Sequence, residues 1–527
     1  FQAYTDTVNL GVGRYTKGYN LSRSQLFEAY ANYNDTWGIH SLDILAGYSW
    51  QNNYWASRSI TYLNETDKVD LNPGETVDSR YLWYRNENFL VSFYGRVNYS
   101  IDSRYVFTVT VRGDGSSKFA KAYRWGFFPS GAFAWNIVQE PFLKGVKEVS
   151  TLKLRLSVGQ TGQQDGIGDY VHMARYTMSN NPSYTYNMGN GNFMNMLTPQ
   201  AYDPTIRWET TTTYNLGLDY GFFNDRLSGS IDAYMRDTKD LLNSVQVPMG
   251  SNFGNRLMTN IGSIRNKGLE FSITGIPVQT AFWSVQVGVN GTFQGTEFTR
   301  LNVTEDDNYY IETGNISKGT GGYLCRQMVG YAPYTYYTYK QKYDAAGKPI
   351  QNEFVDLDGD GQITEGDRYM TGKSASPRFF YGMNLKVTYK DWDFGLNGHG
   401  AAGTWVFNDF ASANSTASLD LNSGALPNQA KLVKKTGFTA PNSGRQWYSD
   451  YFLENASFFR LDDISLGYTF RGIGRWESDI RLALGMQNVF ILTGYSGMDP
   501  EVISETGIDN TIWPRPRTYS LRLNVNF

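Results

Sequence analysis

Residues Phe89–Arg112 read FLVSFYGRVNYSIDSRYVFTVTVR, and this stretch decides the fold. From Phe89 to Ile101 every second residue is apolar apart from one glycine, and the residues between them are mostly polar. The same alternation returns at Tyr105, after the pair Asp102-Ser103. A period of two places apolar side chains on one face of a β-strand and polar side chains on the other. Two such runs joined by a very short break predict an antiparallel hairpin.

The same alternation recurs along the rest of the chain, with spacers of different length. A repeat of period two predicts roughly sixteen strands. The segments with this pattern are Phe1–Val12, Gln25–Tyr33, Ile39–Trp50, Phe89–Ser100, Tyr105–Gly113, Phe127–Ile137, Leu152–Gly159, Thr210–Gly221, Leu227–Arg236, Lys267–Ile276, Phe282–Gln294, Phe379–Tyr389, Trp392–His399, Phe458–Phe470, Ile480–Val489 and Thr518–Phe527.

The spacers alternate in length. Short ones such as Asn34–Gly38 and Lys390–Asp391 alternate with long ones such as Gln51–Asn88 and Thr296–Arg378, apart from two of intermediate length. Outer-membrane barrels join their strands by short periplasmic turns and long extracellular loops. The final segment, Thr518–Phe527, ends on an aromatic residue, which is typical of bacterial outer-membrane barrels. The sequence therefore predicts an all-β, transmembrane antiparallel β-barrel with long extracellular loops.

The alternation also predicts which side chains face lipid. Residues on the apolar face should contact the membrane, and those on the polar face should line the lumen. The polar face carries Arg96, Arg112, Asp219, Asp232 and Arg236. The residues that we expect to face lipid are Tyr99, Phe107, Val109, Leu216, Leu218, Leu466 and Leu523.

Composition agrees with a membrane barrel and argues against several other classes. The chain has 527 residues, with 39 Tyr, 31 Phe and 13 Trp, and aromatic girdles at two membrane interfaces account for such a number. No apolar run approaches the ~18 residues of a membrane helix. The 47 basic and 50 acidic residues nearly balance, so nucleic-acid binding has no electrostatic support. A single cysteine, Cys325, excludes an internal disulfide framework.

Several longer motifs are spread over nearly the whole chain. They are Arg112–Phe119 (RGDGSSKF), Arg124–Ser130 (RWGFFPS), Leu152–Tyr170, Arg207–Leu242, Asn260–Ile273, Asp356–Asp367, Phe459–Phe470, Met498–Glu501 and Pro516–Phe527. Their order and spacing resemble the C-terminal half of SusC-like TonB-dependent transporters, which reside in the outer membrane of Bacteroidota.

This resemblance carries several implications. It implies a barrel of 22 strands with an internal plug, so that residues 1–527 are the C-terminal part of the barrel and the plug, the TonB-contacting segment and about six strands lie upstream of Phe1. It implies active import driven through TonB, with a SusD-like surface lipoprotein as partner. The substrates of the family are oligosaccharides or, for some members, oligopeptides.

The segment Asp356–Asp367, DLDGDGQITEGD, follows the spacing of a calcium-binding loop. Asp356, Asp358 and Asp360 take positions 1, 3 and 5, Gly361 allows the sharp turn at position 6, and Gln362 offers its carbonyl at position 7. Asp367 takes position 12, where the shorter aspartate replaces the usual glutamate. The spacing predicts a structural Ca²⁺ site, and a metal-free acidic turn is the alternative.

Candidate ligand contacts come from two places. Tyr334 and Tyr337 belong to the aromatic run Tyr331–Tyr339 in the longest loop, where the rings could stack on sugars or only pack the loop. Arg96 and Arg112, on the polar strand face, are further candidates, although such charges often only solvate a lumen wall.

Catalytic signals are weak. The three histidines, His40, His172 and His399, are scattered without zinc-ligand spacing. The pair Asp462-Asp463 should point its two carboxylates to opposite faces of one strand, which suits no acid–base pair. We therefore expect no enzyme. The alternatives to an active importer are a passive sixteen-stranded porin and a non-transporting adhesin.

Overall fold

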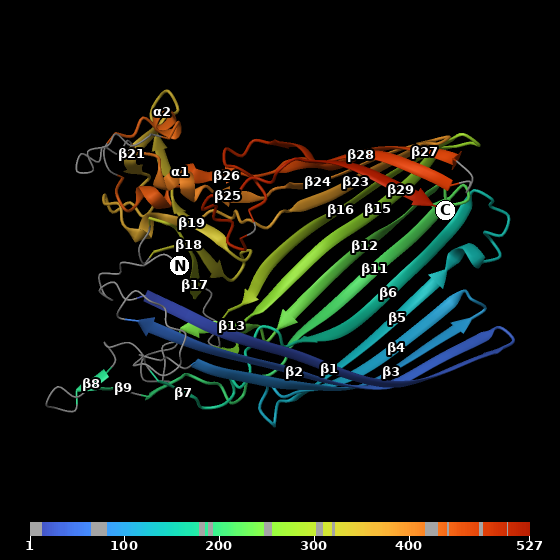
Figure 1. The fold of residues 1–527 in the computed structure, drawn as a ribbon, viewed down its shortest axis with the longest axis horizontal. Coiled ribbons are helices and arrows are strands. Elements are labelled where there is room, and N and C mark those ends of the chain that lie inside the picture. Colours follow the sequence, from blue (N-terminus) through green and yellow to red (C-terminus); the bar gives the residue numbers. More distant parts are fainter. Residues whose placement is uncertain are drawn as a thin grey trace.

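The computed structural model describes residues 13–64, 82–178, 185–187, 193–195, 197–246, 256–301, 309–318, 322–416, 430–439, 442–473, 478–502 and 504–526. One large, strongly curved sheet occupies most of the molecule, and smaller strands and short helices gather at one of its ends (Figure 1). None of the helices in these residues is long and apolar enough to cross a membrane.

The large sheet has fifteen strands, each hydrogen-bonded in antiparallel fashion to the next one of the sheet in chain order. Such a meander is the topology of an up-and-down barrel wall. The strands are β1 (Gly13–Trp37), β2 (His40–Asn64), β3 (Leu82–Ile101), β4 (Tyr105–Ser116), β5 (Trp125–Asn136), β6 (Val149–Gln163), β11 (Glu209–Phe222), β12 (Leu227–Lys239), β15 (Ser263–Gln279), β16 (Trp283–Arg300), β23 (Phe379–Tyr389), β24 (Trp392–Ala402), β27 (Phe458–Ile473), β28 (Ser478–Thr493) and β29 (Thr518–Asn526).

These strands confirm the expected all-β barrel class. Each of the predicted segments from Gln25–Tyr33 to Thr518–Phe527 coincides with one strand of the sheet, and the remaining one, Phe1–Val12, lies outside the described residues. In the described residues β1 pairs only with β2, and β29 only with β28. The described sheet therefore contains fifteen of the roughly sixteen predicted strands.

The first hairpin shows how the short turns are made. Asp102 and Ser103 have φ values of 52° and 53°, and the Arg104 N–H closes the turn by donating to the Ile101 carbonyl at 3.0 Å. The strand pairing begins one residue later, where Ile101 pairs with Tyr105. Two consecutive residues with positive φ twist a two-residue turn in the sense of the flanking strands. The turn thereby sets the register of β3 on β4, and with it the face on which every following side chain of β4 lies.

The two faces of the sheet differ as the alternation predicts. Among the residues expected to face lipid, Phe107, Val109, Leu216, Leu466 and Leu523 are exposed, and Tyr99 and Leu218 are half-buried. Exposed apolar side chains in continuous rows need an apolar solvent, and the hydrocarbon of a bilayer supplies it.

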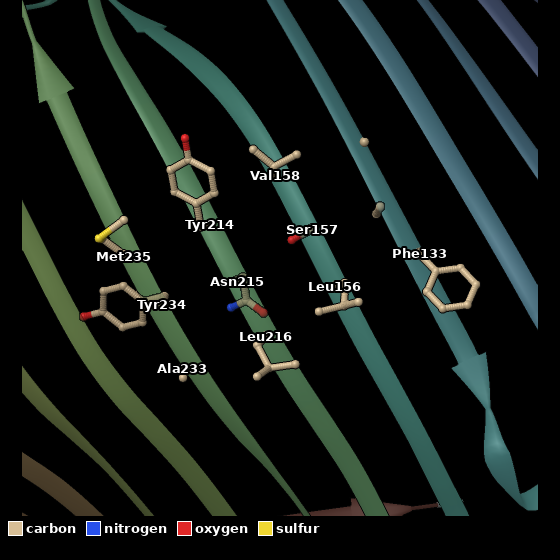
Figure 2. Close-up of a pocket in the computed structure, with 12 residues that line it drawn as sticks. Phe133, Leu156, Ser157, Val158, Tyr214, Asn215, Leu216, Ala233, Tyr234 and Met235 are labelled. Atoms are coloured by element: carbon tan, nitrogen blue, oxygen red, sulfur yellow. The ribbon is translucent and has the colours of Figure 1, made fainter.

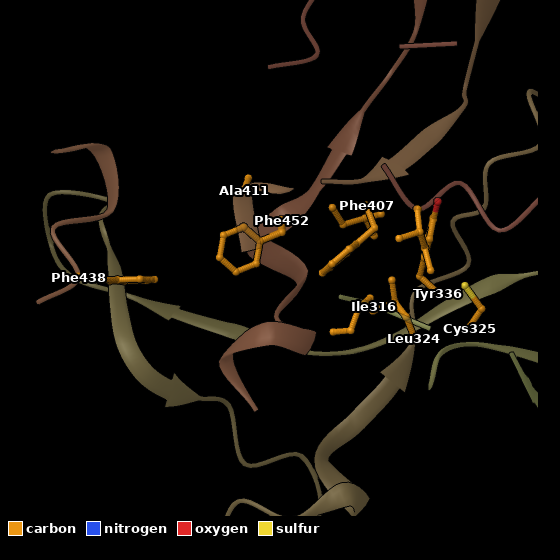
Figure 3. Close-up of a cluster of buried hydrophobic side chains, with 10 residues drawn as sticks. Ile316, Leu324, Cys325, Tyr336, Phe407, Ala411, Phe438 and Phe452 are labelled. Carbon is orange, nitrogen blue, oxygen red and sulfur yellow. The ribbon is translucent and has the colours of Figure 1, made fainter. Parts of the chain in front are cut away.

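Three long loops form one body at the end of the sheet, and we call the described parts of residues 301–378, 403–457 and 494–517 the crown (Figure 1). All three contribute to one buried cluster that includes Leu324, Tyr336, Phe407, Phe452 and Ile508 (Figure 3). The crown contains β17 (Tyr310–Asn315), β18 (Tyr323–Met328), β19 (Thr335–Tyr339), β20 (Gln341–Tyr343), β21 (Pro349–Phe354), β22 (Arg368–Met370), α1 (Asp409–Ala413), α2 (Leu432–Thr436), β25 (Trp405–Phe407) and β26 (Leu453–Asn455).

A second, smaller apolar cluster lies beneath other loops at the same end. It joins Phe119, Phe128, Ile167, Ile206 and Trp208, with the Phe119 and Trp208 rings 5.0 Å apart. The short strands of these loops are β7 (Tyr176–Met178), β8 (Thr185–Asn187), β9 (Phe193–Asn195), β10 (Leu197–Pro199), β13 (Leu242–Gln246) and β14 (Arg256–Asn260).

Candidate functional site

We call the fifteen-stranded sheet the wall. On its polar face, arginine side chains reach across a glycine of the neighbouring strand to form ion pairs. Arg155 on β6 contacts Asp219 on β11 at 2.8 Å and Asp232 on β12 at 3.0 Å. The strand between them has Gly217 in register with both Arg155 and Asp232. A Cβ atom added at Gly217 would lie 2.7 Å from the Arg155 guanidinium carbon, so only glycine leaves room for the arginine to reach across.

The same arrangement recurs near the end of the chain. Arg481 on β28 contacts Asp393 on β24 at 2.5 Å, and Gly467 of the intervening strand β27 lies beneath the pair. Each of these two crossings links three strands through side-chain contacts, in addition to the hydrogen bonds between their backbones. The first crossing joins one arginine to two aspartates, and the second joins one arginine to one aspartate.

The two arginines predicted as ligand contacts have different surroundings in the structure. Arg112 is bound within the wall: its Nε donates to both carboxylate oxygens of Asp114 at 2.8 and 2.9 Å, and a terminal nitrogen donates to the Ser92 hydroxyl at 2.9 Å. Arg96 is exposed on β3, and in the described residues no carboxylate pairs with it. Of the two predicted arginines, Arg96 is therefore the one that no carboxylate of the described residues engages.

The two predicted tyrosine contacts also differ. The Tyr334 hydroxyl donates to Glu505 at 2.7 Å, and burial together with this carboxylate raises the pKa of Tyr334 to about 12. Tyr337 is only 8% exposed, and its ring lies 3.5 Å from the Arg326 guanidinium and 4.4 Å from that of Arg368. Tyr337 thus packs inside the crown, where it holds two arginines.

The predicted calcium loop follows β21 in the crown. The carboxylates of Asp356, Asp358 and Asp367 lie within 4.8 Å of one another, and Gly361 adopts the positive φ of 81° that the sharp turn requires. Asp360 is not part of this group, and its carboxylate accepts from the Gln362 N–H at 2.7 Å. The loop therefore forms an acidic cluster from three of the four predicted carboxylates.

Asp367 is the anchor of this loop. Its two oxygens accept from the N–H groups of Leu357 and Thr364, each at 2.7 Å. These backbone donors, Thr364 first, hold the pKa of Asp367 below its usual range. The other carboxylates of the cluster also accept backbone hydrogen bonds: Asp356 accepts from the Gly359 N–H at 2.7 Å and the Gly361 N–H at 2.9 Å, and Asp358 accepts from the Asp360 N–H at 3.2 Å.

A charged network at the top of the wall was missed by the sequence reasoning. Arg460 on β27 is buried and contacts Asp499 at 2.6 Å, and His399 on β24 contacts Asp462 at 2.6 Å and Glu501 at 3.1 Å. The network ties the loop 494–517 of the crown to the wall. The motif Met498–Glu501 was the available signal, but the sequence offered no partner for it.

The prediction that Asp462 and Asp463 point to opposite faces is wrong. The pairing of β24 with β27 shifts register between Leu461 and Asp463, so a bulge interrupts the alternation. Asp463 accepts from Asn397, and Asp462 contacts His399, which lies two residues further on the same face of β24.

The outer face carries an apolar hollow of about 680 Å³ over β5, β6, β11 and β12 (Figure 2). Small residues at Gly131 and Ala233 leave the space, and larger side chains border it, among them Phe133, Leu156, Val158, Tyr214, Leu216 and Met235. Because this face contacts lipid, the hollow is a groove for hydrocarbon and not a substrate site.

Comparisons with known proteins agree with these features. The chain is 38% identical over 518 residues to the TonB-dependent receptor SusC of Bacteroides thetaiotaomicron. This alignment covers 97% of this chain and 50% of that protein. It is 32% identical over 575 residues to the TonB-dependent receptor P3 of Formosa agariphila, which covers 100% of this chain and 55% of that protein. The chain thus spans about half the length of the curated relatives that it matches.

Among solved structures, the RagAB peptide transporter superposes with a TM-score of 0.81 at 24% identity, over 98% of this chain and 57% of that one. The same importer in its closed-closed state gives a TM-score of 0.82. At this identity the likeness shows a common fold. A family model described as TonB dependent receptor-like, beta-barrel matches residues 1–489. The chain therefore belongs to the TonB-dependent receptor-like β-barrel family, and it is an outer-membrane barrel segment rather than an enzyme.

Proposed function

We propose that the whole protein imports a nutrient actively across the outer membrane, with energy delivered through TonB. The observation that carries this proposal is family membership over most of the chain, on a sheet whose polar face lines a lumen. The relatives are about twice as long as this chain, which leaves room for a plug and for about six further strands of a 22-stranded barrel. Residues 1–527 would then form the C-terminal part of that barrel.

The proposed substrates are oligosaccharides or oligopeptides. The resemblance to SusC-like transporters implies these two classes, and one solved neighbour is described as a peptide transporter. Within the lumen, Arg96 is the best-supported ligand contact because it is exposed and unpaired in the described residues. Arg112, Tyr334 and Tyr337 would act mainly by shaping the wall and the crown, since each has protein partners.

The proposed partner is a SusD-like surface lipoprotein that docks on the crown. The crown exposes large side chains, among them Trp513, Met498 and Phe410, in a setting where such residues commonly bind a protein. The loops behind them share one packed core, so they present these side chains from a stable surface.

Energy dependence tests the proposal. Uptake of labelled oligosaccharides and oligopeptides by cells that carry the full-length protein should stop when a protonophore removes the inner-membrane gradient. The variant Arg96→Gln should weaken uptake, whereas Arg522→Gln, on the strand β29 at the far edge of the sheet, serves as the matched control. Uptake that continues at the same rate without the gradient would establish a passive porin instead.

A separate experiment tests the partner. Purification of the full-length protein in mild detergent should bring a lipoprotein with it, and deletion of the neighbouring lipoprotein gene should abolish efficient uptake. Recovery of the importer alone, with uptake intact after the deletion, would remove the lipoprotein from the mechanism while leaving active transport unaffected.

We further infer that the acidic loop Asp356–Asp367 binds Ca²⁺ as a structural ion. Support comes from the calcium-loop spacing together with the convergence of three carboxylates. Calcium should protect the loop from proteolysis in the full-length protein, and a chelator or the pair Asp358→Ala and Asp360→Ala should remove that protection. Equal cleavage with and without millimolar calcium would reject the ion.

A further inference from the structure

A cavity of about 560 Å³ lies where the crown meets the wall, and nothing in the proposed import mechanism uses it. It opens where a strand pairing stops, because β16 pairs with β23 only from Trp283 to Phe293, although β16 itself continues to Arg300. The residues that border it include Lys267, Gln294, Glu297, Lys373, Arg378 and Trp405. We call it the junction cavity, and the four ligand contacts predicted from the sequence all lie outside it.

Backbone hydrogen bonds fix the frame of the junction cavity. The Gln294 N–H donates to the Arg378 carbonyl at 2.9 Å, and the Arg378 N–H donates to the Ala402 carbonyl at 3.1 Å. On the side of the crown, the Trp405 N–H donates to the Ser374 carbonyl at 3.1 Å. The cavity is therefore a built part of the structure and not a gap between loops that lack contacts.

Arg378 lies on the polar face of the wall. The backbone hydrogen bonds of Arg378 extend the strand alternation by one residue beyond Phe379, so these two side chains lie on opposite faces. Phe379 lies on the apolar face, where its ring centroid is 4.2 Å from that of the exposed Phe293. The Arg378 side chain passes over Gly403, since a Cβ atom added to this glycine would lie 3.1 Å from the Arg378 Cβ. Arg378 therefore faces the lumen.

Arg378 repeats an arrangement that the wall uses elsewhere, but without an acid at its end. Arg155 reaches across Gly217 to two aspartates, and Arg481 reaches across Gly467 to one. Arg378 is exposed, and among the residues that the structure describes no carboxylate forms an ion pair with it. Of these three guanidinium groups, that of Arg378 is thus the one that a ligand carboxylate can engage.

The other charged groups of the junction cavity leave it positive. Its one carboxylate, that of Glu297, contacts Lys267 at 3.6 Å, and both of these side chains have the parity of the apolar face. This pair therefore does not neutralise Arg378. The Lys373 ammonium lies 3.6 Å from the centroid of the Trp405 ring, and no carboxylate in the described ranges pairs with it. Arg378 and Lys373 thus remain as two cations on the border of one cavity.

We propose that the junction cavity binds a carboxylate group of the imported ligand. This inference rests on the proposed import function, and it narrows the substrates to oligosaccharides that contain an acidic sugar or peptides with a free C-terminal carboxylate. The planar Arg378 guanidinium holds the carboxylate through two parallel N–H bonds, and the Lys373 ammonium contributes a further charge-assisted hydrogen bond. A volume of about 560 Å³ is typical of a small-ligand site, so the cavity takes the acidic unit while the rest of the ligand extends into the lumen.

Binding to the purified full-length protein tests the proposal with two pairs of probes. One pair is trigalacturonic acid and its methyl ester, and the other is acetylated trialanine and its C-terminal amide. The second member of each pair lacks the negative charge. Isothermal titration calorimetry should show that Arg378→Gln weakens the binding of at least one acidic probe about tenfold or more, since hydrogen bonds between charged groups are strong. The neutral member of that pair should bind weakly and equally to the unmodified protein and to the variant.

The two pairs of probes also identify the source of the carboxylate. A loss confined to trigalacturonic acid indicates an acidic sugar, and a loss confined to acetylated trialanine indicates a peptide terminus. Arg378→Lys keeps the charge but not the paired geometry, so it should recover only part of the affinity. Arg522→Gln removes an exposed arginine of the polar face that does not border the cavity, and this control should bind the probes as the unmodified protein does.

Lys373→Gln should cause a smaller loss of affinity, and it provides the test if Arg378→Gln fails to fold. Equal binding of the acidic probes by the unmodified protein and by both variants would overturn the proposal, and so would the failure of both acidic probes to bind. These measurements need no membrane gradient. Uptake that continues without the gradient, together with binding that depends on Arg378, would remove active import and keep the site. Gradient-driven uptake with binding that does not depend on Arg378 would keep active import and remove the site.

Discussion

The wall and the crown are stabilised in opposite ways. In the wall, each strand pairs with the next strand of the sheet, and a side chain's surroundings follow from its parity. In the crown, contacts join residues that are far apart in the chain. The Tyr336 hydroxyl lies within hydrogen-bond distance of the carbonyls of Trp405, at 2.9 Å, and Gly507, at 3.0 Å, and the Gln446 amide donates to Gln341 at 2.8 Å. The wall is a repeating structure, whereas the crown has a globular core.

Because of this difference, the stability of the wall depends on the surrounding lipid, whereas the stability of the crown depends on the exclusion of water from its core. The wall buries little apolar surface in protein and relies on its backbone ladder and on the bilayer. The crown must exclude water by packing, and it does so with residues from three loops. A substitution in one region should therefore leave the other nearly unchanged, and the following predictions test that separation in order of expected effect.

The largest effect is expected from Phe452→Ala. Phe452 is 1% exposed and lies 6.2 Å from Phe407 at the centre of the crown cluster. Removal of a buried phenyl ring costs about 3–5 kcal/mol. Hydrogen exchange should show that the crown loses protection while the wall strands keep theirs. Phe410→Ala, at a side chain that is 51% exposed, is the control and should change little. Parallel loss of protection in the wall would show that both regions unfold as one unit.

Val109→Arg should have the next largest effect. Val109 is 56% exposed on the apolar face of β4, and an arginine near the middle of a bilayer costs about 2–4 kcal/mol on a barrel. Thr108→Arg places the same group on the opposite face, where the neighbouring partner is Asn98. Urea unfolding in lipid vesicles should separate the two variants by most of that difference. Equal destabilisation would mean that the two faces are not divided between lipid and water.

Gly217→Ala should destabilise the wall by about 1–3 kcal/mol, because overpacking of a filled site forces neighbours to move. The added methyl group would displace Arg155 from its position over β11 and break its contacts with Asp219 and Asp232. Gly131→Ala is the control, since a Cβ there has no atom within 4 Å. The measurement is again the urea midpoint in vesicles, and an unchanged midpoint for Gly217→Ala would show that the stability of the wall does not depend on the glycine.

The sequence predicts the strands of the wall well because the alternation of polar and apolar residues that reveals each strand lies within that strand. The segment Phe379–Tyr389 was predicted with the bounds that β23 has in the structure. The predicted segments Gln25–Tyr33 and Ile39–Trp50 were too short, because β1 and β2 each continue to 25 residues. Outside the hydrocarbon layer a strand has no apolar face, so the alternation that revealed these strands ends before the hydrogen bonds do.

The candidate site was predictable from the sequence only where the spacing of residues along the chain determines how they are arranged in space. The interval from Asp356 to Asp367 brought three carboxylates together as expected, because a loop of that length with Gly361 closes on itself. The contacts of His399 with Asp462 and Glu501 were not predictable, since a bulge shifts one partner and the other lies 102 residues away. The burial of Tyr337 between two arginines depends on the crown core, which no local pattern encodes.

The smallest expected effect is an acid-dependent loosening of the loop Asp356–Asp367. Backbone N–H groups of Thr364 and Leu357 lower the pKa of Asp367, so the folded loop favours the charged carboxylate more than the unfolded chain does. This stabilisation is therefore fully present above the usual aspartate pKa of about 3.9 and is lost as pH falls through the lower, folded pKa.

A spin label at Gln362→Cys should report the loosening selectively, because Cys325 is buried and its thiol stays unlabelled. The label should keep its restricted mobility from pH 7 to about pH 4 and gain mobility only below the usual aspartate pKa. In Asp367→Asn, which lacks the charge, mobility should be higher and should not change with pH over this range. Loosening that begins near pH 6 would point to a histidine instead, and it would mean that Asp367 does not control the closure of this part of the crown.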